Sequence, residues 1–177
     1  MRSTGEVLGL AETFPLAFYK SQEAAGSELP HAPAAWENKK VLISLSNKES
    51  QKDQVLMIGK TLKDLGFTLV GTQGTADFYN ANGIKCEVVN KIGGGRPDVV
   101  DMIMNKEVCL VINTPKAKRN YAEDRKTIRK MCLKYKVSYI TTLAGAVAAV
   151  KGIEAVKNGN GGEGGVKSLQ EYHSLIK

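Results

Sequence analysis

The fold is decided by the stretch Phe67-Thr68-Leu69-Val70-Gly71-Thr72-Gln73-Gly74-Thr75, in which an apolar strand runs into a tight turn of Gly and Thr. A short helix is expected to follow over 76–82, and the glycines are expected to turn the backbone with positive φ. The first N–H groups of a helix lack partners within it, and its dipole places partial positive charge there. The stretch therefore predicts an anion site suited to phosphate.

A second interpretation of this stretch needs no ligand. In it, Thr75 is only the N-cap of the helix and Thr72 only ends the strand. The stretch alone does not distinguish an anion site from a turn without a ligand, so the choice depends on the rest of the chain.

The composition is that of an ordinary globular protein, with 42% apolar and 24% charged residues in a chain of 177. No apolar run approaches the roughly 18 residues of a membrane span, and no signal-peptide core follows the N-terminus, so we expect a cytoplasmic protein with no membrane partner. The three cysteines form no CxxC pair, and both histidines lie near the ends. We therefore expect no metal site, no disulfide framework and no histidine-based triad.

The net charge of +7 is concentrated in residues 114–136, which hold nine basic and two acidic residues. The basic residues are Lys116, Lys118, Arg119, Arg125, Lys126, Arg129, Lys130, Lys134 and Lys136. Such a segment suits an anionic partner, and the alternative is a solvated helix face. No aromatic stacking platform is interleaved with the basic residues, so we expect no nucleic-acid partner.

Two parts of the chain differ in pattern. Residues 1–38 hold one expected helix, which ends by Ala25, and a Pro- and Ala-rich linker, with Phe14, Phe18 and Tyr19 lacking a core of their own. We interpret 1–38 as the tail of a preceding domain plus a linker, and we expect residues 1–30 to be poorly anchored or packed on a neighbouring molecule. Residues 39–177 are expected to form one domain.

Short apolar strands alternate with helices in the second part. Strands are expected at 41–45, 67–71, 86–89, 109–112 and 138–141, and helices at 55–65, 76–82, 99–104, 124–135 and 143–157, with a capping box opening a last turn at 168–171. This order predicts an α/β fold of three layers, α/β/α, around a five-stranded parallel sheet of Rossmann-like type. Ligands of such sheets bind beyond the carboxyl ends of the strands. Four polar segments fall there, at 44–52, 72–75, 90–96 and 113–118.

These segments resemble the methylglyoxal-synthase-like domain at the C-terminus of the carbamoyl-phosphate synthase large subunit. The resemblance is carried by Val41-Leu42-Ile43-Ser44, Gly71-Thr72-Gln73-Gly74-Thr75-Ala76, Val89-Asn90-Lys91, Gly95-Arg96-Pro97, Val111-Ile112-Asn113-Thr114-Pro115 and Tyr139-Ile140-Thr141-Thr142-Leu143. Residues 1–9 resemble the end of that subunit's second ATP-grasp unit, and 166–173 fit its tail. The resemblance implies the extreme C-terminal part of a longer subunit.

The resemblance implies an allosteric regulatory domain without a catalytic centre, within an ATP-dependent ligase of pyrimidine and arginine biosynthesis. Nucleotide monophosphates would bind here as effectors, and ornithine at the border with the synthetase domain. The implied partners are the remainder of the large subunit, the glutaminase small subunit and further copies of the chain. ATP, Mg and K are implied for the parent enzyme and no cofactor for this chain.

Site residues follow position by position from the resemblance. Effector phosphate would be bound by Lys52, Thr72, Thr75 and Lys91, the nucleoside by Ser44, Asn113, Thr114, Asp124, Thr127 and Ile128, and ornithine by Tyr139. The loop over 44–52 is longer than in relatives, so Lys48 competes with Lys52, and residues 115–118 also depart from the family. Simpler roles stay open, with Lys91 as a loop charge, Thr114 as a strand end and Tyr139 as a sheet-packing residue.

Two other functions compete. Methylglyoxal synthase, acting on dihydroxyacetone phosphate, shares the fold but needs a carboxylate base beside the phosphate, and this chain has Arg96-Pro97 where the enzyme has an acid. The other alternative is a module that serves oligomerisation only. Specific binding of a nucleotide monophosphate would separate regulation from oligomerisation alone, and turnover of dihydroxyacetone phosphate would indicate the enzyme.

Overall fold

The computed structural model describes residues 3–30, 40–46, 50–114, 122–159 and 167–176. A five-stranded sheet forms its centre, with the strand order β3-β2-β1-β4-β5 and parallel pairing throughout. The strands are β1 (Lys40–Leu45), β2 (Thr68–Thr72), β3 (Cys86–Val89), β4 (Val108–Thr114) and β5 (Ser138–Ile140). The chain runs outward from β1 through β2 to β3, then crosses back to β4 on the other side of β1.

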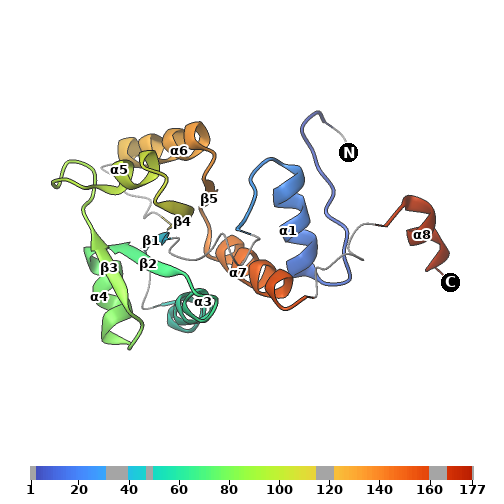
Figure 1. The fold of residues 1–177 in the computed structure, drawn as a ribbon, viewed down its shortest axis with the longest axis horizontal. Coiled ribbons are helices and arrows are strands. Elements are labelled where there is room, and N and C mark those ends of the chain that lie inside the picture. The colour runs from blue at the N-terminus through green and yellow to red at the C-terminus, as the bar shows by residue number, and fades with distance from the viewer. Residues whose placement is uncertain (1–2, 31–39, 47–49, 115–121, 160–166, 177) are drawn as a thin grey trace.

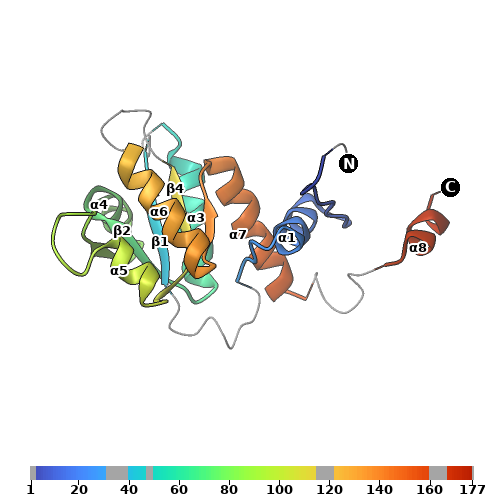
Figure 2. The ribbon, with the colours of Figure 1, turned by 90° about the horizontal axis from the view of Figure 1, so that it is seen from above.

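Helices cover both faces of the sheet (Figures 1 and 2). One face carries α5 (Val99–Met104) and α6 (Ala122–Tyr135), and the other carries α3 (Lys52–Asp64), α4 (Gln73–Ala81) and α7 (Leu143–Lys157). Strand side chains alternate between the two cores, as the pleat requires. In β1, Val41 and Ile43 join the core under α3, α4 and α7, and Leu42 joins the core under α5 and α6. The predicted three-layer α/β fold is confirmed.

Helix α4 begins earlier than its sequence predicts. The prediction of 76–82 is wrong, because the helix starts at Gln73 and already contains Gly74 and Thr75 in its first turn. The prediction that Gly71 and Gly74 have positive φ angles is also wrong, since neither residue has a positive φ angle. Gly71 is instead a site of close approach, where a Cβ atom would lie 3.1 Å from the Ile43 carbonyl oxygen and 3.2 Å from Cys86 Sγ.

The N-terminal helix α1 (Phe14–Ala24) packs against α7 (Figure 1). Its Tyr19 is buried in the main core together with Leu29, and the Tyr19 hydroxyl donates to the Leu29 carbonyl oxygen at 3.4 Å. Gly152 of α7 permits the contact, because a Cβ atom there would lie 2.8 Å from the Pro15 carbonyl oxygen. The prediction that residues 1–30 are poorly anchored is therefore wrong for α1 and Leu29. The division at residue 38 stays a prediction.

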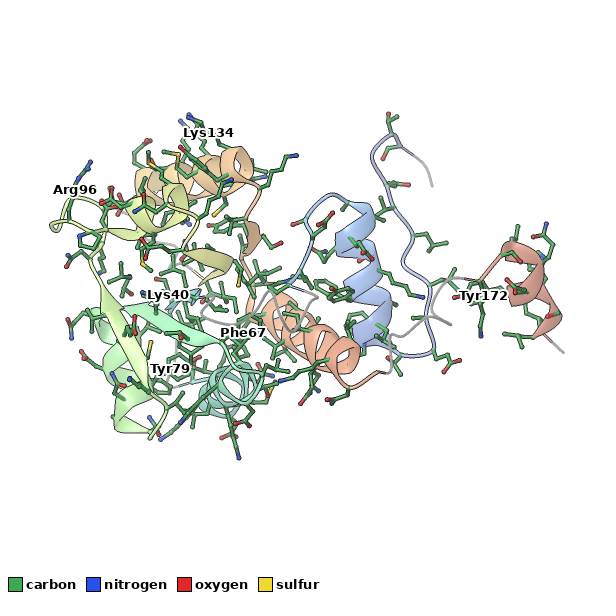
Figure 3. The ribbon with its side chains drawn as sticks, viewed as in Figure 1. Lys40, Phe67, Tyr79, Arg96, Lys134 and Tyr172 are labelled. Atoms are coloured by element: carbon green, nitrogen blue, oxygen red, sulfur yellow. The ribbon has the colours of Figure 1, made fainter. Side chains whose placement is uncertain are left out.

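The C-terminal helix α8 (Leu169–Ser174) lies beside the N-terminal segment, away from the sheet (Figure 3, in which Tyr172 is labelled). The Tyr172 hydroxyl donates to the Leu10 carbonyl oxygen at 3.3 Å, and Lys167 Nζ lies 3.8 Å from a Glu12 carboxylate oxygen. The predicted capping box is present, between Ser168 and Glu171. Among the described residues, no helix is long and apolar enough to cross a membrane.

Candidate functional site

A pocket of about 280 Å³ opens over the carboxyl ends of β1, β2 and β4. From β1 the chain adds β2 and β3 on one side of the sheet and then β4 and β5 on the other side of β1, so the strand order reverses between β1 and β4. The pocket lies at this reversal, which is the usual ligand position in open parallel sheets. The lining residues are Leu42, Ser44, Leu45, Ser46, Thr72, Gly74, Thr75, Lys91, Ile92, Val99, Val111, Asn113, Thr114, Asp124, Arg125 and Ile128. Two ends with different chemistry can be distinguished.

The α4 end of the pocket is made by Thr72, Gly74, Thr75 and Lys91. Thr72 is the N-cap residue of the nine-residue helix α4, and its side chain makes no capping hydrogen bond. The N–H groups of the first helical turn and the positive end of the helix dipole lie at this end, which Lys91 also lines. Hydroxyl, amide and ammonium donors gathered in this way are suited to an anion.

Two of the threonines also hold the exit of β1 in place. The Thr75 hydroxyl accepts a hydrogen bond from the Leu45 N–H at 3.2 Å, and the Thr114 hydroxyl accepts one from the Ser46 N–H at 3.2 Å. Thr75 is buried, with 2% of its surface exposed. The interpretation of Thr75 as the N-cap is therefore wrong, because Thr72 has that position and Thr75 bonds across to another strand.

The α6 end of the pocket is made by Asn113, Thr114, Asp124, Arg125 and Ile128. The Asn113 side-chain Nδ2 donates to the Tyr139 hydroxyl oxygen at 3.3 Å. Burial raises the pKa of Tyr139, partly offset by this hydrogen bond and by the nearby Arg129 and Arg125. The phenol is therefore neutral at physiological pH. This end offers amide and carboxylate groups, which can bind the hydroxyl and N–H groups of a ligand.

The structure brings eight of the eleven predicted site residues into the pocket lining: Ser44, Thr72, Thr75, Lys91, Asn113, Thr114, Asp124 and Ile128. Lys52 is an exposed residue at the start of α3, and neither Thr127 nor Tyr139 lines the pocket. Lys48 and the segment 115–118 lie outside the described residues. The roles assigned to all these residues stay predictions.

Arg125 is a charged lining residue that the sequence analysis did not select for the pocket. It precedes Ile128 by three positions on α6, and residues three apart share a helix face. That spacing could have identified it. Leu42 lies two positions before Ser44 on β1, so strand alternation places both on one face of the sheet.

The other basic residues of α6 lie outside the pocket. Lys126, Arg129, Lys130 and Lys134 are exposed, and Lys134 points away from the sheet in Figure 3. The apolar side of α6 faces the sheet, because Cys132 is buried in the core and Ile128 and Tyr135 pack against it. The basic segment is thus divided, with Arg125 in the pocket and these four cations in solvent.

Two of the three thiols, those of Cys86 and Cys132, are buried and unsuited to nucleophilic or metal chemistry. Burial raises the pKa of both Cys86 and Cys132 to about 12, so both thiols stay protonated at neutral pH. Within the described ranges, no group of three or more His, Cys, Asp or Glu residues could hold a metal ion.

A parallel α/β sheet with a pocket over its carboxyl edge has the architecture of the Rossmann-like class, whose members bind small molecules at this edge. The profile of the MGS-like domain family matches residues 54–141, and the chain belongs to this family.

The relatives of the chain are carbamoyl phosphate synthase large chains. It is 45% identical over 173 residues to the large chain of Archaeoglobus fulgidus, covering 98% of this chain and 15% of that one. The chain is 44% identical over 176 residues to the large chain of Ralstonia nicotianae, and this match covers 99% of this chain and 15% of the relative. It is 43% identical over 157 residues to the Methanopyrus kandleri protein named as the C-terminal section of the large chain, and this match covers 89% of this chain and 28% of the relative. The chain thus spans 15 to 28% of these relatives.

Proposed function

We propose that this chain is the C-terminal regulatory section of a carbamoyl phosphate synthase large chain and that its pocket binds a nucleoside monophosphate effector. The observation that carries the proposal is the pairing of the two pocket ends. Cationic and N–H donors gather at the α4 end, and Asn113 and Asp124 lie at the α6 end. The similarity to carbamoyl phosphate synthase large chains supports the assignment to this parent enzyme. The Methanopyrus kandleri relative is named as a C-terminal section, which supports the assignment to the C-terminal part of the large chain.

The size and chemistry of the pocket suit a mononucleotide. Its volume of about 280 Å³ lies near the lower end of the roughly 300–1,000 Å³ usual for small-molecule sites, which favours one nucleotide over a dinucleotide or a polymer. A phosphate dianion needs donors and cations but no proton transfer, and Lys91, Thr72 and the first turn of α4 can supply them. Leu42, Val111 and Ile128 add apolar surface for the nucleoside.

Regulation would then act on catalysis elsewhere in the parent large chain. An effector shifts activity only by binding two conformations of the enzyme with different affinity, so the elements around the pocket must differ between those conformations. Ornithine bound near Tyr139, the glutaminase small subunit and further copies of the chain are part of the same proposal.

A thermal-shift panel of nucleoside monophosphates and ornithine tests the proposal. A ligand at a hundred times its dissociation constant stabilises a protein by about 2.7 kcal/mol, which for a domain of this size raises the melting temperature by roughly 5–10 °C. We expect such a shift with at least one nucleoside monophosphate and no comparable shift with the same nucleoside lacking phosphate. No shift with any nucleotide would contradict the proposal.

Dihydroxyacetone phosphate belongs in the same panel, because Asp124 places a carboxylate in the pocket lining and the enzymatic alternative needs a carboxylate base. We expect no turnover of this compound by the purified chain. Turnover that disappears in an Asp124→Asn variant would overturn the regulatory proposal in favour of the enzyme. The oligomerisation-only alternative predicts that no nucleotide binds.

A further inference from the structure

The side-chain amide of Asn113 is held from one side only. Asn113 lies near the end of β4 with 6% of its surface exposed, and its Nδ2 donates to the Tyr139 hydroxyl oxygen at 3.3 Å. Tyr139 lies on the neighbouring strand β5, where its register partner is Val111. Its ring packs against the core beneath α5 and α6, so the hydroxyl is carried on a supported ring.

The other end of the amide has no protein partner in the described part of the chain. A side-chain amide carries two donors on its nitrogen and an acceptor oxygen on the other side. No described residue donates a hydrogen bond to the Asn113 Oδ1 atom, although buried polar atoms of this kind almost always have a partner. Because Asn113 lines the pocket, a ligand or water there is the natural donor to Oδ1.

We infer that Tyr139 is a positioning residue, whose hydroxyl holds the Asn113 amide in place so that its other edge faces a ligand in the pocket. The inference rests on the proposed function and names a specificity element for it. The free edge of this amide then hydrogen-bonds a polar group of the nucleoside. Without the Tyr139 hydroxyl, the amide loses the partner that holds it in place, and its hydrogen bond to the ligand weakens.

The two ends of the pocket make this inference separable from a general loss of binding. Phosphate is expected to contact Thr72, Thr75 and Lys91, none of which hydrogen-bonds to Tyr139 in the described structure. Inorganic phosphate, which is expected at the α4 end, therefore reports binding without the nucleoside contacts, whereas a nucleoside monophosphate probes both ends. A change in Tyr139 that acts through Asn113 should affect the second ligand and leave the first unaffected.

The test compares Tyr139→Phe with the wild type by calorimetry, using the nucleoside monophosphate that binds best and inorganic phosphate as a competitor. Loss of one ordinary hydrogen bond predicts a fall of about two- to tenfold in nucleotide affinity, with inorganic phosphate affinity unchanged. Tyr135→Phe is the matched control. It removes the same hydroxyl from a half-buried tyrosine of the same core, which makes no hydrogen bond to a described residue.

A double-mutant cycle shows whether the effect passes through Asn113. In an Asn113→Ala background, Tyr139→Phe should have no further effect on nucleotide affinity. The inference is overturned if Tyr139→Phe binds the nucleotide like the wild type, if both ligands weaken equally, or if the effect persists in full without Asn113. A wild-type chain that binds phosphate but no nucleotide would overturn the proposed function together with the inference.

Discussion

Replacement of Lys91 by alanine is expected to weaken nucleoside monophosphate binding by about ten- to a hundredfold. Lys91 lies two residues after the end of β3 and lines the α4 end of the pocket together with Thr72 and Thr75. Loss of a charged hydrogen-bond donor costs roughly 1.5–3 kcal/mol, and each 1.4 kcal/mol is a tenfold change in affinity. Lys91 is exposed and belongs to no apolar core, so the variant should fold normally. Isothermal titration calorimetry measures the effect.

Lys85→Ala is the matched control for Lys91→Ala. Lys85 is an exposed lysine just before β3, at the opposite edge of the sheet from the pocket. Its removal lowers the net charge equally and should leave affinity nearly unchanged. Lys52→Ala tests the phosphate role implied by the family resemblance, and a smaller effect than that of Lys91→Ala is expected because Lys52 does not line the pocket. Equal affinity in Lys91→Ala and wild type would place the ligand elsewhere.

Tyr19→Ala is expected to lower the free energy of unfolding by about 3–5 kcal/mol, the range for truncating a large buried aromatic side chain. Tyr19 lies on α1, is 6% exposed, and joins the main core between α1 and α7. The substitution leaves a cavity in that core and removes the hydrogen bond from the Tyr19 hydroxyl to Leu29. Urea unfolding followed by circular dichroism measures the change.

Phe14→Ala serves as the control on the same helix, because Phe14 is 70% exposed. A change within about 0.5 kcal/mol is expected for it, as for surface substitutions generally. A Tyr19→Ala variant as stable as Phe14→Ala would mean that α1 does not dock on α7 in solution. Residues 1–38 would then behave as the loosely attached tail that the sequence analysis expected.

The central sheet could be predicted from the sequence because its strands are short apolar runs bounded by Gly and polar residues. The predicted bounds 86–89, 99–104 and 143–157 are those observed for β3, α5 and α7. Once the strands are parallel, their carboxyl ends must meet at one edge. Thr72, Lys91 and Asn113 could therefore be brought together without coordinates.

Packing between distant segments could not be predicted in this way. Helix α1 has its partner, α7, more than a hundred residues later, and the contact depends on the missing side chain of Gly152. The start of α4 was misplaced because Gly74 reads as a turn residue, although it lies in the first helical turn. The Asn113–Tyr139 hydrogen bond joins two strands through side chains alone, and no local pattern reveals it.

The most direct test of the central claim is a two-dimensional ¹H–¹⁵N NMR titration of the wild-type chain with a nucleoside monophosphate. The account predicts saturable shifts concentrated in the backbone amides around the pocket, namely those of residues 44–46, 72–75, 91–92 and 113–114. The amides on the outer side of α6, around Lys130 and Lys134, should shift little. Shifts centred on that outer basic face, or no saturable shifts at all, would contradict the account.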